Sequence, residues 1–217
     1  MSESIDNDNQ WWYNNTDNSV GLEVIYEMKM EADERKKQIR QASIAVFLKK
    51  GFRNTVMNDI MEATGLSRGG LYHHYGSTYE ILYDIMLEGN KYREKIIYDE
   101  MNNTSQDFSE VLSEIILEKM LYQNDYVSIY AMFLQELNHD DKLKDLYKKL
   151  KKSSSDSILM LFDEDVRGEL SEAIELITDL INTFILGCEV LNARENFVKN
   201  KFALKKMIGI ILDNNAK

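Results

Sequence analysis

Residues 65–75 read GLSRGGLYHHY, and this stretch decides how the N-terminal part of the chain folds. Gly65 permits a tight reversal of the backbone and Ser67 is a suitable N-cap, so we expect a short helix from Arg68 to about Tyr75. Apolar residues recur at helical spacing over residues 57–64, which predicts another short helix just before the turn. The pattern is therefore typical of a helix-turn-helix.

The second helix of this pair contains two adjacent glycines, Gly69 and Gly70, which together cost a helix roughly 2 kcal/mol relative to alanine. Without side chains, the start of the helix can approach another surface closely, and its N–H groups and dipole favour an anion such as phosphate. Donors for phosphates and base edges are Arg68, Tyr72, His73 and His74. We expect no metal site, because adjacent histidines on a helix point about 100° apart.

Helical periodicity continues along the rest of the chain, and no segment shows the alternation of a strand. Ser77 and Glu80 form a capping box before a further apolar stripe. The last two helices are expected at about residues 171–193 and 199–212. The sequence predicts an all-α fold of about nine helices.

The net charge of −11 at first argues against binding to nucleic acid, because phosphate contacts need a positive surface. The charge is unevenly distributed, however. Residues 35–79 carry eight basic and two acidic side chains, a local charge of +6, whereas residues 1–34 carry −8 and residues 80–217 carry −9. The acidic total conceals a basic segment, in which we expect phosphate contacts from Arg35, Lys36 and Lys50, and Ser67 at the start of the reading helix.

Several protein classes are excluded by composition. The single cysteine, Cys188, rules out an internal disulfide framework and a multi-cysteine zinc site, and it suits the cytoplasm. No run of 18 apolar residues exists, so we expect no membrane-spanning helix and no membrane partner. We find no nucleophile–base set, no HExxH motif and no phosphate-cradling glycine loop, and therefore expect neither an enzyme nor a cofactor.

The last two predicted helices are apolar on more than one side, so both sides must be buried. In a chain of this length, one side can face the chain's own core and the other a second copy. We therefore expect a homodimer, against the alternative of a purely internal core. The expected interface residues are Leu176, Leu180, Phe184, Gly187, Leu191, Met207 and Ile211.

We divide the chain into three parts: an acidic extension over 1–33, a helix-turn-helix domain over 34–78, and a larger helical domain over 79–217. The extension is expected to be disordered, since no sustained helical period precedes about Glu34. Translation from Met28 or Met30 is an equal alternative.

Two stretches, TVMNDI at residues 55–60 and GLSRGGLYHHY at residues 65–75, resemble the DNA-binding signature of the tetracycline-repressor (TetR) family. The resemblance runs from about Arg35 to Leu82. It implies a homodimeric regulator, most simply a repressor, that binds a palindromic operator in double-stranded DNA and is released by a small effector. By the same resemblance, Thr55 caps the second helix and touches phosphate, Arg68 and Gly69 lie at the base-reading end, and Tyr72, His73 and His74 contact DNA.

The resemblance also implies that the middle helices enclose the effector. The aromatic residues expected at that pocket are Phe108, Tyr122, Tyr126, Tyr130, Phe133, Tyr147 and Phe162. Acidic surroundings favour an apolar or cationic effector over an anionic one. The alternative function is a protein-interaction adaptor whose helix-turn-helix does not bind DNA.

Overall fold

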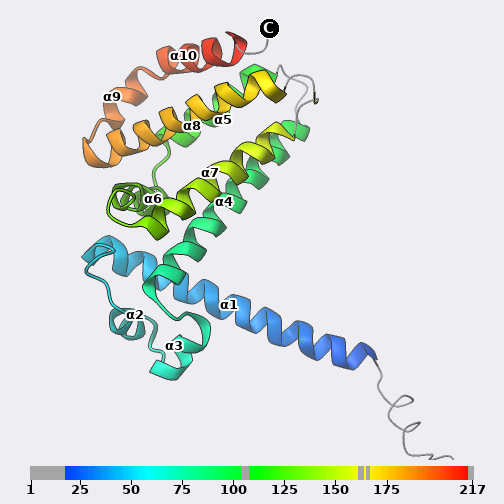
Figure 1. Ribbon diagram of the computed structural model, residues 1–217, viewed down its shortest axis with the longest axis vertical. Helices are drawn as coiled ribbons and strands as arrows, with labels where there is room; N and C mark the ends of the chain where they lie inside the picture. The colour runs from blue at the N-terminus through cyan, green and yellow to red at the C-terminus, as the bar shows by residue number, and fades with distance from the viewer. Residues whose placement is uncertain (1–17, 104–107, 161–163, 165–166, 215–217) are drawn as a thin grey trace, which may run out of the picture.

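The computed structural model describes residues 18–103, 108–160, 164 and 167–214 and contains ten α-helices, with no strand among these residues (Figure 1). The helices are α1 Asn18–Lys50, α2 Met57–Thr64, α3 Arg68–His74, α4 Thr78–Asn103, α5 Phe108–Leu121, α6 Asp125–Glu136, α7 Asp141–Leu159, α8 Arg167–Val190, α9 Arg194–Lys199 and α10 Lys201–Asn214. The all-α prediction is confirmed, and the helix beyond the expected nine is the short α9. None of the described helices is long and apolar enough to cross a membrane.

Helix α1 begins well before the expected residue 34, and the prediction of a disordered extension over 1–33 is wrong for residues 18–33. The first 17 residues lie outside the described part of the chain. Residues 18–33 show no sustained helical spacing of apolar residues, because this half of α1 projects past α2 and α3 instead of packing along them (Figure 1). A helix that is already nucleated adds one hydrogen bond per residue, and the three Glu, two Met and one Lys of residues 18–33 are good helix formers.

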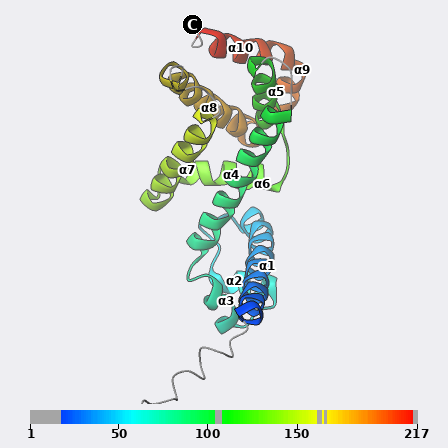
Figure 2. The same cartoon turned by 90° about the vertical axis from the view of Figure 1, so that its right-hand side faces the viewer.

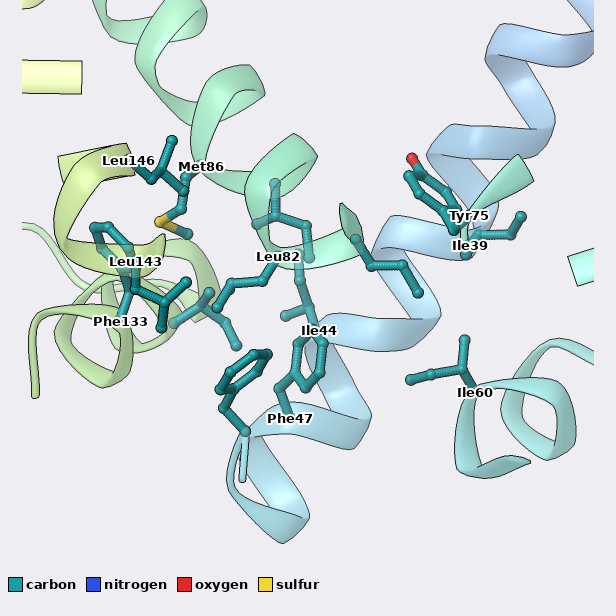
Figure 3. Packing of buried hydrophobic residues seen from close by; sticks show 14 of the residues in the cluster. Ile39, Ile44, Phe47, Ile60, Tyr75, Leu82, Met86, Phe133, Leu143 and Leu146 are labelled. Carbon is teal, nitrogen blue, oxygen red and sulfur yellow. The ribbon is translucent and has the colours of Figure 1, made fainter. Parts of the chain in front are cut away.

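The first core joins the N-terminal helices to α4, α6 and α7. Phe47 and Ile60 are fully buried in it, and Leu82, Phe133 and Leu146 reach it from the other side (Figure 3). The core therefore runs across the predicted domain boundary at residues 78/79. That boundary stays a prediction.

A second core lies between α5, α6, α8 and α10, and it includes Leu112, Ile181 and Ile208. The two cores place α2 and α3 at one end of the molecule and α9 and α10 at the other, with α4 running between them (Figure 2). Ser77 caps α4 by accepting the N–H of Glu80 at 3.3 Å. The Glu80 carboxylate accepts the N–H of Gly76 at 2.8 Å, one residue earlier than a regular capping box requires.

Replacing Phe47 by alanine should destabilise the fold by about 3–5 kcal/mol, because a fully buried ring is lost and a cavity is left. The measurement is the free energy of unfolding in urea at a fixed protein concentration. Tyr92→Ala is the matched control, since that ring is 66% exposed and its loss should change stability by less than about 0.5 kcal/mol. Equal effects of the two substitutions would contradict this assignment of the core.

Candidate nucleic-acid interface and internal cavity

The turn between α2 and α3 is set by two residues. Gly65 takes a left-handed conformation, with φ of 68°, and its N–H donates to the Met61 carbonyl at 2.9 Å, which ends α2. Ser67 then caps α3, because its Oγ accepts the N–H of Gly70 at 3.2 Å. The helix-turn-helix predicted from residues 65–75 is confirmed.

Helix α3 has a buried side and an exposed side. Leu71 is fully buried and Tyr75 is 3% exposed, and both pack into the first core. On the other side, Arg68, Tyr72 and His73 are exposed, and the Arg68 guanidinium lies 5.6 Å from the centroid of the Tyr72 ring. A cation and two aromatic donors are thus presented to solvent at one end of the molecule.

The two glycines of α3 differ in whether packing within the chain requires a glycine at that position. A Cβ on Gly70 would approach the capping Ser67 Oγ to 3.3 Å, so this glycine accommodates the chain's own N-cap. A Cβ on Gly69 would meet nothing within 4 Å. Nothing among the described residues requires Gly69, although glycine costs a helix about 1 kcal/mol. Its bare backbone therefore suits close approach by an external surface.

Thr55 does not lie as predicted, and Lys50 has an acidic partner within the chain. Thr55 is buried, and its hydroxyl donates to the Gly51 carbonyl at 2.9 Å, so it neither caps α2 nor faces solvent. The N-cap is Val56, whose N–H donates to the Asp59 carboxylate at 2.9 Å. Lys50 pairs with the same carboxylate at 2.6 Å and, with the Val56 N–H, lowers the pKa of Asp59. The charge of Lys50 is therefore partly neutralised within the chain.

Three of the predicted basic contacts lie near one another at the α1–α3 junction. Burial and the charges of His73, Lys36 and Arg35 lower the pKa of His74, which favours the neutral imidazole. Arg35 is exposed and donates to Gln38 at 2.8 Å. Lys36 lies 5.2 Å from the centroid of the Tyr75 ring and 3.9 Å from the Asp84 carboxylate. This corner of the molecule carries positive charge beside α3.

A polar network that the sequence analysis missed ties α3 to α1 and α4. Tyr75, the C-cap of α3, donates its hydroxyl to Asp84 at 2.8 Å and accepts from Arg40 at 3.3 Å. Arg40 also donates to both carboxylate oxygens of Glu88, at 2.7 and 3.0 Å. Burial raises the pKa of Tyr75 and keeps its hydroxyl protonated as a donor. The sequence feature that could have indicated this network is Arg40, a basic residue in an otherwise apolar helical stripe.

A cavity of about 340 Å³ lies between α4, α5, α6, α7 and α8. This volume falls at the lower end of the range for small-molecule sites, about 300–1,000 Å³. Much of its wall is aliphatic, contributed by α5 and α8: Leu112, Ile115, Ile116, Ile174, Ile177 and Ile181.

Of the five predicted pocket residues whose side chains the structure describes, two line this cavity, Tyr130 and Tyr147. Phe133 instead is fully buried in the first core, and Tyr122 and Tyr126 are exposed around the α5–α6 connection. The physical reason is the rotation of α6, which turns Tyr130 toward the cavity and Phe133 toward α1 and α4. Phe162 and the side chain of Phe108 lie outside the described part of the structure.

Two tyrosine hydroxyls of the wall are hydrogen-bonded to the side chain of Asn182. The Tyr130 hydroxyl donates to Asn182 Oδ1 at 3.0 Å, and Asn182 Nδ2 donates to the Tyr147 oxygen at 2.9 Å. Lys151, also in the wall, is neutralised by Glu175 and Asp179 at 3.2 and 2.8 Å. These groups have partners within the chain and make no demand on a ligand.

Arg93 and Lys119 are different. Neither has an acidic group within 4.0 Å among the described residues, and the Nε of Arg93 is buried without a hydrogen-bond partner there. Burial, followed by repulsion from Arg93, lowers the pKa of Lys119 to about 7, and burial lowers the pKa of Arg93. The other titratable groups of the wall are Glu94, Lys95, Tyr98, Tyr130, Tyr147 and Lys151. The cationic effector expected from the acidic composition disagrees with these two cations.

Comparison with known proteins supports the N-terminal geometry. Residues 39–85 match the family described as "Bacterial regulatory proteins, tetR family". The N-terminal region of the chain is therefore similar to that of TetR-family regulators. An HTH-type transcriptional regulator of Bacillus subtilis, YfiR, is 41% identical over 61 residues, which cover 28% of this chain and 30% of YfiR. TtgR of Pseudomonas putida is 34% identical over 59 residues, 27% of this chain and 28% of TtgR. The chain thus matches less than a third of the length of either relative.

Solved structures extend the TetR likeness to the whole fold. GusR of Salmonella enterica superposes with a TM-score of 0.68 at 18% identity, covering 82% of this chain and 95% of GusR. A TetR-family regulator of Pectobacterium atrosepticum gives 0.61 at 15% identity, over 84% and 96%. The multidrug binding protein EbrR, in complex with malachite green, gives 0.60 at 12% identity, over 82% and 98%. At these identities the likeness shows a shared fold alone.

The residues predicted for a dimer interface fall into three groups. Leu176 and Leu191 are 49% and 76% exposed. Phe184 and Gly187 are instead covered by α9, whose Phe197 ring lies 4.5 Å from the Phe184 ring and 3.4 Å from a Cβ placed on Gly187. The remaining three, half-buried in the α8–α10 region, are Leu180, Met207 and Ile211. Exposed neighbours absent from the prediction are Val190, Val198, Phe202 and Ile210.

Lys119 should titrate near pH 7, far below the ordinary lysine value of about 10.4, because its ammonium is desolvated and faces Arg93. NMR of ¹³C-methylated lysines measures this, with Lys119→Arg identifying the signal. The midpoint should rise in Arg93→Gln, since one repulsive charge is removed. A midpoint at the ordinary value in the unmutated protein would show that Lys119 does not lie in the cavity wall.

Proposed function

We propose that this TetR-family protein is a ligand-responsive transcriptional regulator that binds two-fold symmetric operator DNA as a homodimer in the cytoplasm. The observation that carries the proposal is the exposed side of α3, where Gly69 leaves the backbone bare next to Arg68. Among the described residues, nothing requires glycine at position 69, and Arg68 is exposed and lies over the ring of Tyr72. Regulation without catalysis agrees with the HTH-type regulators that match residues of this region.

The positions around α3 favour a particular approach to DNA. Its N-terminal N–H groups and Arg68 would face base edges and phosphates in the major groove, and Tyr72 and His73 would lie beside them. Arg35 and Lys36 of α1 lie on the adjacent corner and would contact the phosphate backbone. Thr55 and Lys50, engaged within the chain, would contribute through positioning alone.

The dimer proposal rests on exposed aliphatic and aromatic side chains of α8, α9 and α10, far from α3. Leu191 and Phe202 are 76% and 70% exposed, and Leu176 and Ile210 are 49% and 61% exposed. Contiguous apolar surface on one side of a molecule is typical of an oligomer interface. A two-fold arrangement through this end would carry two copies of α3, which match two half-sites about 34–36 Å apart.

Helix α4 is the proposed connection between ligand and DNA. Its first turns contribute Ile81 and Ile85 to the core that holds α3, and Arg93 and Tyr98 further along line the cavity. A ligand that contacts Arg93 more strongly in one position of α4 favours that position. Through Asp84 and Glu88, the same helix holds Tyr75 and Arg40, so its position sets the orientation of α3.

Arg68→Ala should weaken binding to DNA by about 1–3 kcal/mol, roughly tenfold to a hundredfold, because a base-edge or phosphate contact is lost. The measurement is fluorescence anisotropy with duplexes selected by the protein from a randomised pool, at two salt concentrations. Lys148→Ala is the control, since it removes the same charge from the exposed surface of α7.

Three outcomes separate the possibilities. Selection of a two-fold symmetric site, with affinity that falls steeply with salt, supports the regulator. Salt-dependent binding without sequence preference favours the adaptor instead. No binding at low salt would contradict both the assignment of α3 and the family function.

Leu191→Glu should weaken self-association by at least about tenfold, because a charge is placed in the proposed apolar interface. Sedimentation equilibrium measures the effect, and far-UV circular dichroism checks that the helices persist. Tyr122→Glu alters a ring that is 60% exposed near the α5–α6 connection and should leave association unchanged. A monomeric unmutated protein at micromolar concentration would refute the homodimer.

A further inference from the structure

The charged groups around the cavity do not cancel. Lys151 is already paired with two carboxylates. The acidic residue of the wall, Glu94, accepts hydrogen bonds from two neutral donors, Asn90 Nδ2 at 2.7 Å and Ser153 Oγ at 3.2 Å. Arg93 and Lys119 have no acidic partner within 4.0 Å among the described residues. The excess charge at this wall is therefore positive, in a chain whose net charge is −11.

Packing alone does not account for the two cations. The Arg93 guanidinium lies 5.4 Å from the centroid of the Tyr130 ring, and this contact orients it. Its Nε, however, is buried with no hydrogen-bond partner in the described structure. Buried donors and charges are almost always paired, because desolvation is otherwise uncompensated. Two neighbouring cations, one of them with an orphaned donor, thus point to a missing anion.

We infer that the cavity binds an amphipathic anion, with one acidic headgroup between Arg93 and Lys119 and an apolar body against the aliphatic wall of α5 and α8. This inference rests on the proposed role of the cavity as the effector site. Arg93 supplies the planar fork that suits a carboxylate, and Lys119 adds a point charge. The aliphatic wall includes Leu112 and Ile177.

The size and lining of the cavity narrow the ligand class. At about 30 Å³ per water-sized group, 340 Å³ accommodates roughly eleven such groups. A medium-chain carboxylate fits this volume. A ligand with several phosphates would need more cations than these two, and a cation would be repelled by both.

Isothermal titration calorimetry on the full chain without DNA tests this with three probes of one chain length: octanoate, octanol and octylamine. Octanoate should bind at least about tenfold more tightly than octanol, and octylamine should not bind detectably. Arg93→Gln and Lys119→Met should each weaken octanoate about 30-fold or more while changing octanol by less than about threefold. Lys91→Gln is the control, because it removes an exposed charge of α4 outside the cavity wall.

Thermal unfolding gives a second readout that does not depend on the probe. Removal of a half-buried charge that has no acidic partner among the described residues should stabilise the ligand-free protein, so Lys119→Met should raise its melting temperature by about 2–4 °C. A side chain retained for structure would give the opposite sign. A lower melting temperature together with unchanged octanoate binding would overturn the inference.

The failure of this inference differs from the failure of the regulator proposal. Equal binding of octanoate and octanol, or binding unaffected by Arg93→Gln, overturns the anion site, while operator binding by Arg68 and its neighbours is untouched. Octanoate binding that depends on Arg93 but leaves DNA affinity unchanged supports the anion site and overturns its role in regulation.

Discussion

Helix α4 packs against the N-terminal helices at its start and lines the cavity further along. The rest of the structure depends on this one continuous helix. Ile81, Leu82 and Ile85 are almost fully buried against the N-terminal helices. Thirteen residues beyond Ile85, Tyr98 lies at the cavity wall, about 20 Å further along the axis at 1.5 Å per residue. As one continuous helix, α4 is the element through which a shift at the cavity would reach the N-terminal helices.

Ion pairs at the start of α4 explain why α3 should respond to a change in the position of α4. Asp84 and Glu88 hold Tyr75 and Arg40 in a partly buried cluster, where the effective dielectric is lower than in water. The same two carboxylates reduce the charge that the N-terminal helices present to DNA. The local +6 of residues 35–79 is therefore an upper bound, since acidic partners arrive from α4 and, through the Arg53–Glu136 pair, from α6.

The sequence predicted what depends on neighbours along the chain and missed what depends on packing. Gly65, Ser67 and the glycine pair act within one turn, so the helix-turn-helix could be predicted in detail. Thr55 was misplaced because a hydroxyl before a helix is a cap by pattern, whereas here it satisfies the Gly51 carbonyl. The start of α1 was missed because a projecting helix needs no apolar stripe.

The cavity was harder to predict for a related reason. The pocket was predicted from aromatic residues on the middle helices. The rotation of α6, however, places Tyr130 at the cavity and Phe133 in the core. Charged residues in helices are normally assigned to the solvent side, so Arg93 and Lys119 gave no signal. Only the meeting of α4 with α5 makes them neighbours.

This meeting of helices also provides a reason for selectivity. Arg93 belongs to α4 and Lys119 to α5, so their separation changes whenever α4 moves relative to the second core. An anion between them gains most where the two cations are close and loses that gain where they part. Without the anion, repulsion between Arg93 and Lys119 favours the arrangement in which the two cations are further apart. The differential affinity that any ligand-driven switch requires is therefore present in two side chains on the two helices that would have to move.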